Sequence, residues 1–137
     1  MDTTFTINNI YKKISSAIVD YAVGIKIVTL AGDDAFSFYA AEIGPHKKVG
    51  AHYHAEGAEI YQIVEGSGII HIGKNINKDK ITWIKSAKVK KGDCFTIQAG
   101  EAHQLINDRE KRLILLFGCP KTHVTTDRTI VKGYEEL

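Results

Sequence analysis

The chain has little cysteine and proline, with two residues of each among 137. Two cysteines are too few for a disulfide framework, and Cys94 and Cys119 are not spaced as a zinc-binding pair. We therefore expect two reduced thiols in a cytoplasmic protein. Cys94 opens an apolar run and is expected to be an inert thiol of the core.

Long apolar runs and clusters of positive charge are also missing. No run approaches the ~20 residues of a membrane-spanning helix. The opening "MDTTFTINN" lacks the basic and apolar regions of a secretory signal. The net charge is only +2 and the basic residues are scattered in pairs, so nucleic acid is not an expected partner. A small molecule remains as the expected ligand.

Apolar residues from 7 to 21 recur at three- and four-residue spacing, which predicts an amphipathic helix that ends before Gly24. From residue 25 onward, short apolar or alternating runs are separated by glycines and polar turns. This pattern predicts about nine or ten strands with hardly any helix between them. An all-β antiparallel sandwich or barrel is the expected architecture.

The predicted organisation is one domain with short ends. We expect an N-terminal helical or extended arm over residues 1–24, a β-barrel over 25–132 and a polar tail over 133–137. The segment "KNINKDK" is predicted to be the tip of a hairpin, and residues 128–132 are predicted to form a last short strand.

The stretch "GAHYHAEGAEIYQIVEGSG" places His52 and His54 two residues apart and ahead of Glu59. On a strand, the two histidines point to the same side with Cα atoms about 7 Å apart. Imidazoles at that separation can converge on an ion about 2.0–2.2 Å from each nitrogen, and Glu59 can add an oxygen ligand. The spacing alone also fits a polar strand end with exposed histidines.

A second stretch, "GDCFTIQAGEAHQLIN", has a similar character. Gly100 allows a tight turn after an apolar strand, and His103 follows just beyond it. A third histidine at this place would complete a shell of three imidazoles and one carboxylate.

These two stretches resemble the motifs of a small single-domain cupin. Four residues separate His54 from Glu59 and six separate Glu59 from a glycine, as the first motif requires. The second motif is matched by its glycines, histidine and asparagine at Gly92, Gly100, His103 and Asn107. Two turn positions depart from the pattern: His46 replaces a glycine and Gln98 replaces a proline.

The resemblance implies a double-stranded β-helix, or jelly-roll, barrel over roughly residues 25–132. It also implies one divalent metal held by His52, His54, Glu59 and His103. Iron, manganese, nickel, copper and zinc all suit three nitrogens and one oxygen. The implied function is a metal-dependent enzyme of dioxygenase, isomerase, epimerase or decarboxylase type acting on a small polar metabolite. The alternative is a small-molecule-binding or sensor module without turnover.

Beyond the metal ligands, no residue pattern identifies a catalytic group. Tyr61 and Ile63 share the parity of Glu59 and are expected to line the barrel, and His71 is a further candidate for the lining. His123, in the tail, is expected to be solvated. The sequence leaves open whether an inward-facing cation is supplied by Lys26, Lys85 or Arg112. Small cupins often pair through outer strands, so a homodimer is expected.

Overall fold

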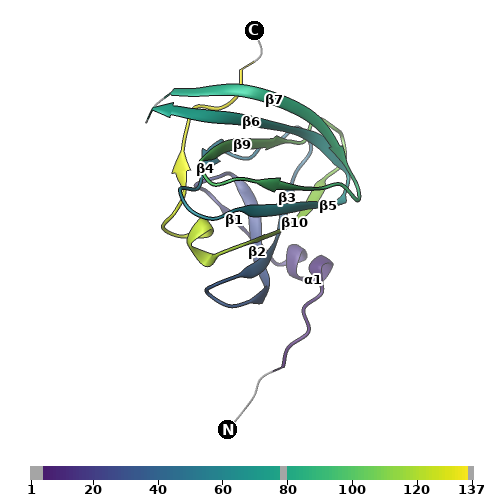
Figure 1. Ribbon diagram of the computed structural model, residues 1–137. Coiled ribbons are helices and arrows are strands. Elements are labelled where there is room, and N and C mark those ends of the chain that lie inside the picture. Colours follow the sequence, from purple (N-terminus) through teal and green to yellow (C-terminus); the bar gives the residue numbers. More distant parts are fainter. Residues whose placement is uncertain (1–4, 78–79, 136–137) are drawn as a thin grey trace.

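The computed structural model describes residues 5–77 and 80–135. Within them, eleven strands form two antiparallel sheets, and helix is confined to one short α-helix and one 3-10 turn (Figure 1). The elements are α1 (Ile10–Ser15), β1 (Ile18–Asp20), β2 (Ile25–Gly32), β3 (Ser37–Ile43), β4 (His52–Tyr53), β5 (Glu59–Glu65), β6 (Ser67–Asn77), β7 (Lys80–Lys90), β8 (Cys94–Ile97), β9 (Glu101–Ile106), β10 (Leu113–Cys119), η1 (Lys121–Val124) and β11 (Thr129–Ile130). No helix in these residues has the length and apolar character that crossing a bilayer requires.

The chain passes back and forth between the two sheets. Sheet A has the order β1-β2-β3-β10-β5-β8, and sheet B has the order β11-β4-β9-β6-β7. Strands that are distant in sequence are therefore neighbours: β10 lies between β3 and β5, and β4 lies between β11 and β9. Figure 1 shows sheet B arching over sheet A. This arrangement is the predicted jelly-roll barrel, and the predicted all-β fold is confirmed.

The core lies between the sheets because alternate residues of each strand point inward. Strand β5 shows the pattern: Glu59, Tyr61 and Ile63 are buried, whereas Ile60 and Gln62 between them are exposed. Glu59 thus shares the inward face with residues of the hydrophobic core. A buried carboxylate at that place needs compensating partners.

The helix predicted over residues 7–21 is much shorter in the structure. Its first turn is capped by Asn9, whose side-chain oxygen accepts hydrogen bonds from two backbone amides. The helix ends at Ser15, and Ile18 and Val19 instead belong to β1, which pairs with β2. Two β-branched residues in succession favour a strand, and the pairing satisfies their backbone groups, so the hairpin prevails over the helical spacing.

Among the other local predictions, one is confirmed, one lies partly outside the described residues and one is wrong. The last short strand is confirmed as β11, although it covers only Thr129–Ile130. The centre of the predicted hairpin tip, residues 78–79, lies outside the described residues. The expectation that Cys94 is a core thiol is wrong, because the residue is exposed. Strand β8 is an edge strand of sheet A, and its residues alternate so that Ile97 rather than Cys94 is buried.

Candidate metal centre

Strands β4 and β9 place two histidines opposite each other. His52 pairs directly with His103 across the two strands, so both side chains leave the same face of sheet B. His54 follows just after β4, and its carbonyl accepts a hydrogen bond from the amide of Gly100 at 2.7 Å. The turn at Gly100, where φ is 79°, therefore ties the segment before His103 to the first histidine pair.

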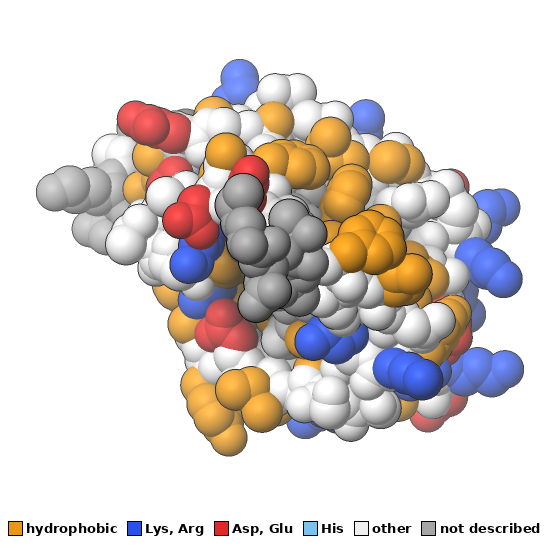
Figure 2. Space-filling model, turned by 90° about the horizontal axis from the view of Figure 1, so that it is seen from below, with side chains coloured by type: hydrophobic (Ala, Val, Ile, Leu, Met, Phe, Trp, Pro, Cys, Tyr) orange, Lys and Arg blue, Asp and Glu red, His pale blue; other side chains and the backbone are white. Residues whose placement is uncertain are grey.

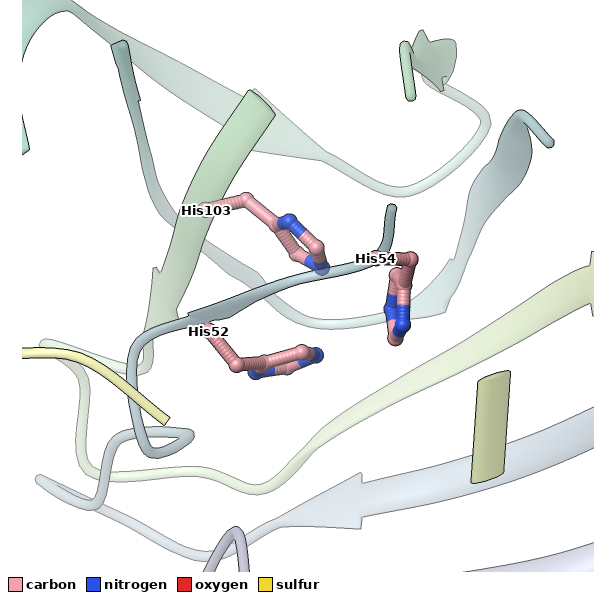
Figure 3. Close-up of side chains that lie close together, drawn as sticks. All are labelled: His52, His54 and His103. Carbon is pink, nitrogen blue, oxygen red and sulfur yellow. The ribbon is translucent and has the colours of Figure 1, made fainter. Parts of the chain in front are cut away.

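The three imidazole rings converge on one space. Ring centroids lie 4.3 Å apart for His52 and His103, 5.0 Å for His52 and His54, and 5.3 Å for His54 and His103. Figure 3 shows the three rings turned toward a common centre from the two strand segments. One ring nitrogen from each lies within 4.8 Å of the others, and all three residues are buried. The predicted convergence is thus present in the fold.

The outer nitrogen of each ring identifies its tautomer. Each Nδ1 faces a backbone carbonyl oxygen, which can only accept, so each Nδ1 carries the proton and donates it. These three hydrogen bonds are His52 to Gly50 at 2.7 Å, His54 to Asp127 at 2.7 Å and His103 to Glu101 at 3.0 Å. The Nε2 atom of each neutral ring consequently presents a lone pair to the centre. Metal-bound histidines are commonly oriented by such an outer hydrogen bond.

The inner nitrogens are not satisfied within the described part of the chain. There, the Nε2 atoms of His54 and His103 are buried and have no hydrogen-bond partner. A buried acceptor left without a partner costs about 1–3 kcal/mol. A cation between the lone pairs removes that cost, so the residues fit a bound metal ion.

Glu59 supplies the carboxylate of the predicted shell. Its Oε2 lies 3.0 Å from Nε2 of His54. When the His54 ring is neutral, its one proton is on Nδ1, and this contact then places two acceptor atoms face to face. A nearby cation would turn that unfavourable contact into shared coordination. The three histidines form one potential metal-binding group, and Glu59 joins it through a second group that shares His54.

His123 is the functional candidate that the sequence did not reveal. It was expected to be solvated, but it lies in η1 with an exposed fraction of only 1%. Its Nδ1 contacts Glu59 Oε2 at 2.8 Å, and its Nε2 contacts the carbonyl oxygen of Glu56 at 2.6 Å. The ring also stacks on His54 at 4.0 Å with an interplanar angle of 2°. No spacing in the sequence indicates these contacts, which join residues more than 60 positions apart.

The shifts in pKa show which of these groups are neutral and which are charged. Burial lowers the pKa of His52 to about 3 and the pKa of His103 to about 4, so both rings stay neutral and keep a lone pair. Burial alone would raise the pKa of Glu59, but the hydrogen bond from His123 leads the effects that hold it below its usual range. Burial alone would lower the pKa of His123, yet its hydrogen bond to Glu59 leads the effects that raise it. The two form a buried ion pair.

The residues predicted to line the barrel have different surroundings. Tyr61 lines a cavity that also contains His52, His54 and Glu59, and its ring lies 5.9 Å from that of His103. Ile63 belongs to the hydrophobic core and is not among the residues that line this cavity.

The prediction that His71 lines the pocket is wrong for this cavity. Its neighbours Ile70 and Ile72 line a separate groove, and His71, between them in β6, points to the opposite face of sheet B. There it contacts the hydroxyl of Ser86 and stacks on Tyr134 at 3.8 Å.

The arginine that lines the cavity is not among the three Lys and Arg residues considered from the sequence. Lys26 pairs with Glu42, and Arg112 pairs with Glu42 and Glu65. Lys85 lines a separate groove. The metal-site cavity, of ≈ 20 Å³, is instead lined by Arg128.

Among the described residues, Arg128 pairs with one carboxylate, and its side chain is largely buried. Its guanidinium donates to both carboxylate oxygens of Asp20, at 2.9 and 3.4 Å. The side chain of Arg128 is 11% exposed. A positive group therefore stands beside the candidate ligands, close enough to line the same cavity.

The two departures from the cupin motifs have local explanations. His46 has a φ of 58°, the left-handed conformation that favours the glycine usual at this position. Gln98 donates its backbone N–H to the carboxylate of Glu101 at 2.7 Å, a bond that proline lacks the hydrogen to make. Neither departure displaces a candidate ligand.

Comparison with known proteins agrees with this geometry. Residues 39–119, more than half of the chain, match the family model described as the cupin domain. All four predicted metal ligands lie within that segment. A search of the curated proteins found no significant match.

Solved structures share the fold. One is an uncharacterized conserved protein with a double-stranded beta-helix domain from Klebsiella pneumoniae, 13% identical with a TM-score of 0.69, covering 95% of this chain and 100% of that one. Another is a cupin 2 conserved barrel domain protein from Salinispora arenicola, 15% identical with a TM-score of 0.63, covering 85% and 88%. A predicted oxalate decarboxylase from Thermotoga maritima is 25% identical with a TM-score of 0.57, covering 69% and 77%. The chain belongs to the cupin family.

Proposed function

We propose that this cupin binds one divalent transition metal through His52, His54, Glu59 and His103, and acts as a metal-dependent enzyme on a small carboxylate. One observation carries the metal site: buried Nε2 lone pairs, which have no partner among residues 5–77 and 80–135, face a common centre beside a buried carboxylate. When bound, the metal supplies a Lewis acid that polarises a coordinated oxygen. Iron, manganese, nickel, copper and zinc all suit this donor set.

The substrate class follows from Arg128. A guanidinium recognises a carboxylate through two parallel hydrogen bonds, and Arg128 already holds the carboxylate of Asp20 in this way. A substrate carboxylate would take the place of Asp20 on the same group. Most of the other lining residues are apolar, among them Val23, Ile27 and Phe117. The site thus suits a small anion, and oxalate is the first probe because one similar structure is a predicted oxalate decarboxylase.

A binding or sensor module without turnover is the second candidate. The cavity of ≈ 20 Å³ favours it, because that space admits little more than one water-sized group. In that case the metal would hold one small group beside Arg128, and no product would form.

Elemental analysis tests the metal site. The wild-type protein is purified without added metal or chelator, beside the His52→Ala/His103→Ala double variant and an exposed-histidine control, His46→Ala. We expect about one metal ion per chain in the wild type and the control, and none in the double variant. The proposal is wrong if the wild type holds no metal even after reconstitution with each of the five ions.

The reconstituted protein then separates the two functions. It is incubated with oxalate and other small carboxylates, and product formation is followed beside equilibrium binding. Turnover that is lost in the double variant supports the enzyme. Saturable binding to the metal-loaded protein without product supports the binding module.

We also propose that the protein works as a cytoplasmic homodimer. Two observations support this: Cys94 and Cys119 are unpaired, and the exposed Ile18 lies in β1, an edge strand of sheet A, with the exposed Tyr21 in the turn just after it. Figure 2 views the molecule from the lower side of Figure 1 and shows hydrophobic groups separated by charged side chains. Light scattering of the wild type beside Ile18→Asp tests the dimer, which the added charge should dissociate.

A further inference from the structure

The segment after β10 lies along the histidine strand. Strand β11 pairs with β4, with Ile130 opposite His52, and the amide of Val131 donates to the carbonyl of Ala51 at 2.9 Å. All of this segment follows residue 119, where the match to the cupin domain ends. The candidate ligands therefore have neighbours that the family match does not include.

Two residues of this segment contact two of the four candidate ligands. His123 donates from Nδ1 to the Glu59 carboxylate at 2.8 Å. The backbone carbonyl of Asp127 accepts the Nδ1 proton of His54 at 2.7 Å. These contacts act on the ligand atoms from outside: one fixes the direction of the carboxylate, and the other fixes the tautomer that turns the Nε2 lone pair inward.

The same two residues also hold the loop between the ligands. The Asp127 carboxylate accepts hydrogen bonds from the amides of Ala55 at 2.7 Å and Glu56 at 3.0 Å. His123 donates from Nε2 to the carbonyl of Glu56 at 2.6 Å. The loop that links His54 to Glu59 is thus fastened by three bonds from one segment, and the spacing between these two ligands depends on it.

We propose that His123 and Asp127 are positioning residues of the metal centre, through which the segment after the cupin match sets how tightly His54 and Glu59 bind metal. This rests on the proposed metal site. His123 is not itself a ligand, because both of its ring nitrogens are hydrogen donors to protein oxygens and neither has a free lone pair.

Cobalt(II) binding to the full-length protein tests the proposal. The variants are His123→Leu, His123→Gln and Asp127→Ala, with Thr122→Ala as the matched control in the same 3-10 turn. The readouts are the number of ions per chain, the dissociation constant and the visible absorption spectrum of the bound ion. Thermal unfolding of each metal-free variant shows that the fold is kept.

We expect His123→Leu to weaken cobalt binding by about 10- to 100-fold while still taking up one ion at saturation. Asp127→Ala keeps the backbone carbonyl that holds His54 but removes the carboxylate that holds the loop, and it should weaken binding in the same direction. His123→Gln, whose amide can donate to Glu59, should recover much of the affinity and the wild-type spectrum, and Thr122→Ala should match the wild type. If the segment after β10 only stabilises the fold, every folded variant will keep the cobalt affinity and the spectrum of the wild type. That result would overturn the proposal.

The results distinguish failure of this inference from failure of the proposed metal site. If the wild type binds cobalt and both positioning variants bind it equally well, only this inference is wrong. If His123→Gln binds as weakly as His123→Leu and its spectrum shows one nitrogen fewer, His123 is a ligand and the positioning role is wrong. If the wild type takes up no cobalt, the proposed metal site and this inference fall together.

Discussion

His123 and Glu59 form a buried ion pair across 64 positions of the sequence, with 2.8 Å between Nδ1 and Oε2. The side chains are 0% and 3% exposed, respectively. A carboxylate placed on the inward face of β5 is therefore matched by an imidazolium from a segment outside the barrel strands. The pair links the stability of the fold to the geometry of the candidate metal centre.

Breaking this pair on one side is expected to be costly. Glu59→Gln removes the carboxylate and leaves His123 without its charged partner, so the free energy of unfolding of the metal-free protein should fall by about 3 kcal/mol or more. Glu59→Gln/His123→Gln leaves two amides that can bond to each other, so the double variant should lose less than the two single losses together. Urea denaturation at neutral pH in the presence of chelator measures the free energy of unfolding of the wild type, the two single variants and the double variant. If the losses in the two single variants add up to the loss in the double variant, the two residues are not coupled.

The metal-free protein should lose stability in acid because of His52 and His103. Burial lowers their pKa values to about 3 and about 4, against an ordinary value of 6.5. Between roughly pH 4 and pH 6.5 the unfolded state therefore binds more protons than the folded state, and the free energy of unfolding falls as the pH falls through this window. The slope reaches about 1.4 kcal/mol per pH unit for each ring.

Denaturation curves between about pH 7 and pH 5 test this sign. His103→Gln removes one titrating ring, so its curve should be shallower than that of the wild type. His123 contributes little slope below its ordinary pKa of 6.5: its pKa is raised, so there it is protonated in both states, and its contribution is lost only as the pH rises above 6.5 and through the raised value. Parallel curves for His103→Gln and the wild type would contradict the assignment.

Metal addition should reverse much of this instability. A ligand that binds only the folded state at 100 times its dissociation constant raises the free energy of unfolding by about 2.7 kcal/mol. We expect zinc to raise the melting temperature of the wild type and of His46→Ala, and a chelator to abolish the gain. Since His103→Ala removes one inward lone pair, its melting temperature should respond much less, and an equal response would place the zinc elsewhere.

The sequence revealed the parts of the site that depend on local spacing. His52 and His54 lie two positions apart and Gly100 precedes His103 by three, so strand alternation and one tight turn bring their rings together. The β-sheet character of the fold follows in the same way from short apolar runs between glycines. Such features require no knowledge of which distant segments meet.

The parts that the sequence did not reveal depend on distant contacts. His123 reaches Glu59 across 64 positions and Arg128 reaches Asp20 across 108, and neither has a spacing that marks it. His71 was wrongly predicted to line the pocket, because strand alternation does not say which face of a strand is buried. Tyr134 covers the outer face of sheet B at His71. The prediction of a long helix was wrong for a related reason: Ile18 lies in β1, which pairs with the distant strand β2.

The strained backbone at His46 offers a gain in stability. With φ at 58°, a non-glycine residue there costs about 1 kcal/mol, so His46→Gly should relieve that strain. The exposed pair that His46 forms with Glu110 is worth little and offsets the gain only slightly. His46→Ala is the matched control, because it removes the pair but keeps the strain. The free energy of unfolding from chemical denaturation should therefore be higher for His46→Gly than for the wild type, and lower for His46→Ala. If His46→Gly is instead less stable than the wild type, the pair with Glu110 matters more than the backbone strain.

Arg128 is expected to decide how well the metal-loaded protein binds a small anion. Charged hydrogen bonds contribute about 1.5–3 kcal/mol, so Arg128→Gln should weaken oxalate binding by about 10-fold or more. Asp20→Asn removes the internal carboxylate that now occupies Arg128, and it should therefore tighten oxalate binding. Titration calorimetry on cobalt-loaded protein measures both changes.

Lys26→Gln is the control for net charge, because it removes one positive charge whose partner, Glu42, lies outside the cavity lining. Its oxalate affinity should stay close to that of the wild type. Equal weakening in Lys26→Gln and Arg128→Gln would mean that only the overall charge matters. Unchanged binding in both Arg128→Gln and Asp20→Asn would show that the anion reaches the metal without displacing Asp20 from Arg128, and the assignment of a carboxylate substrate would lose its support.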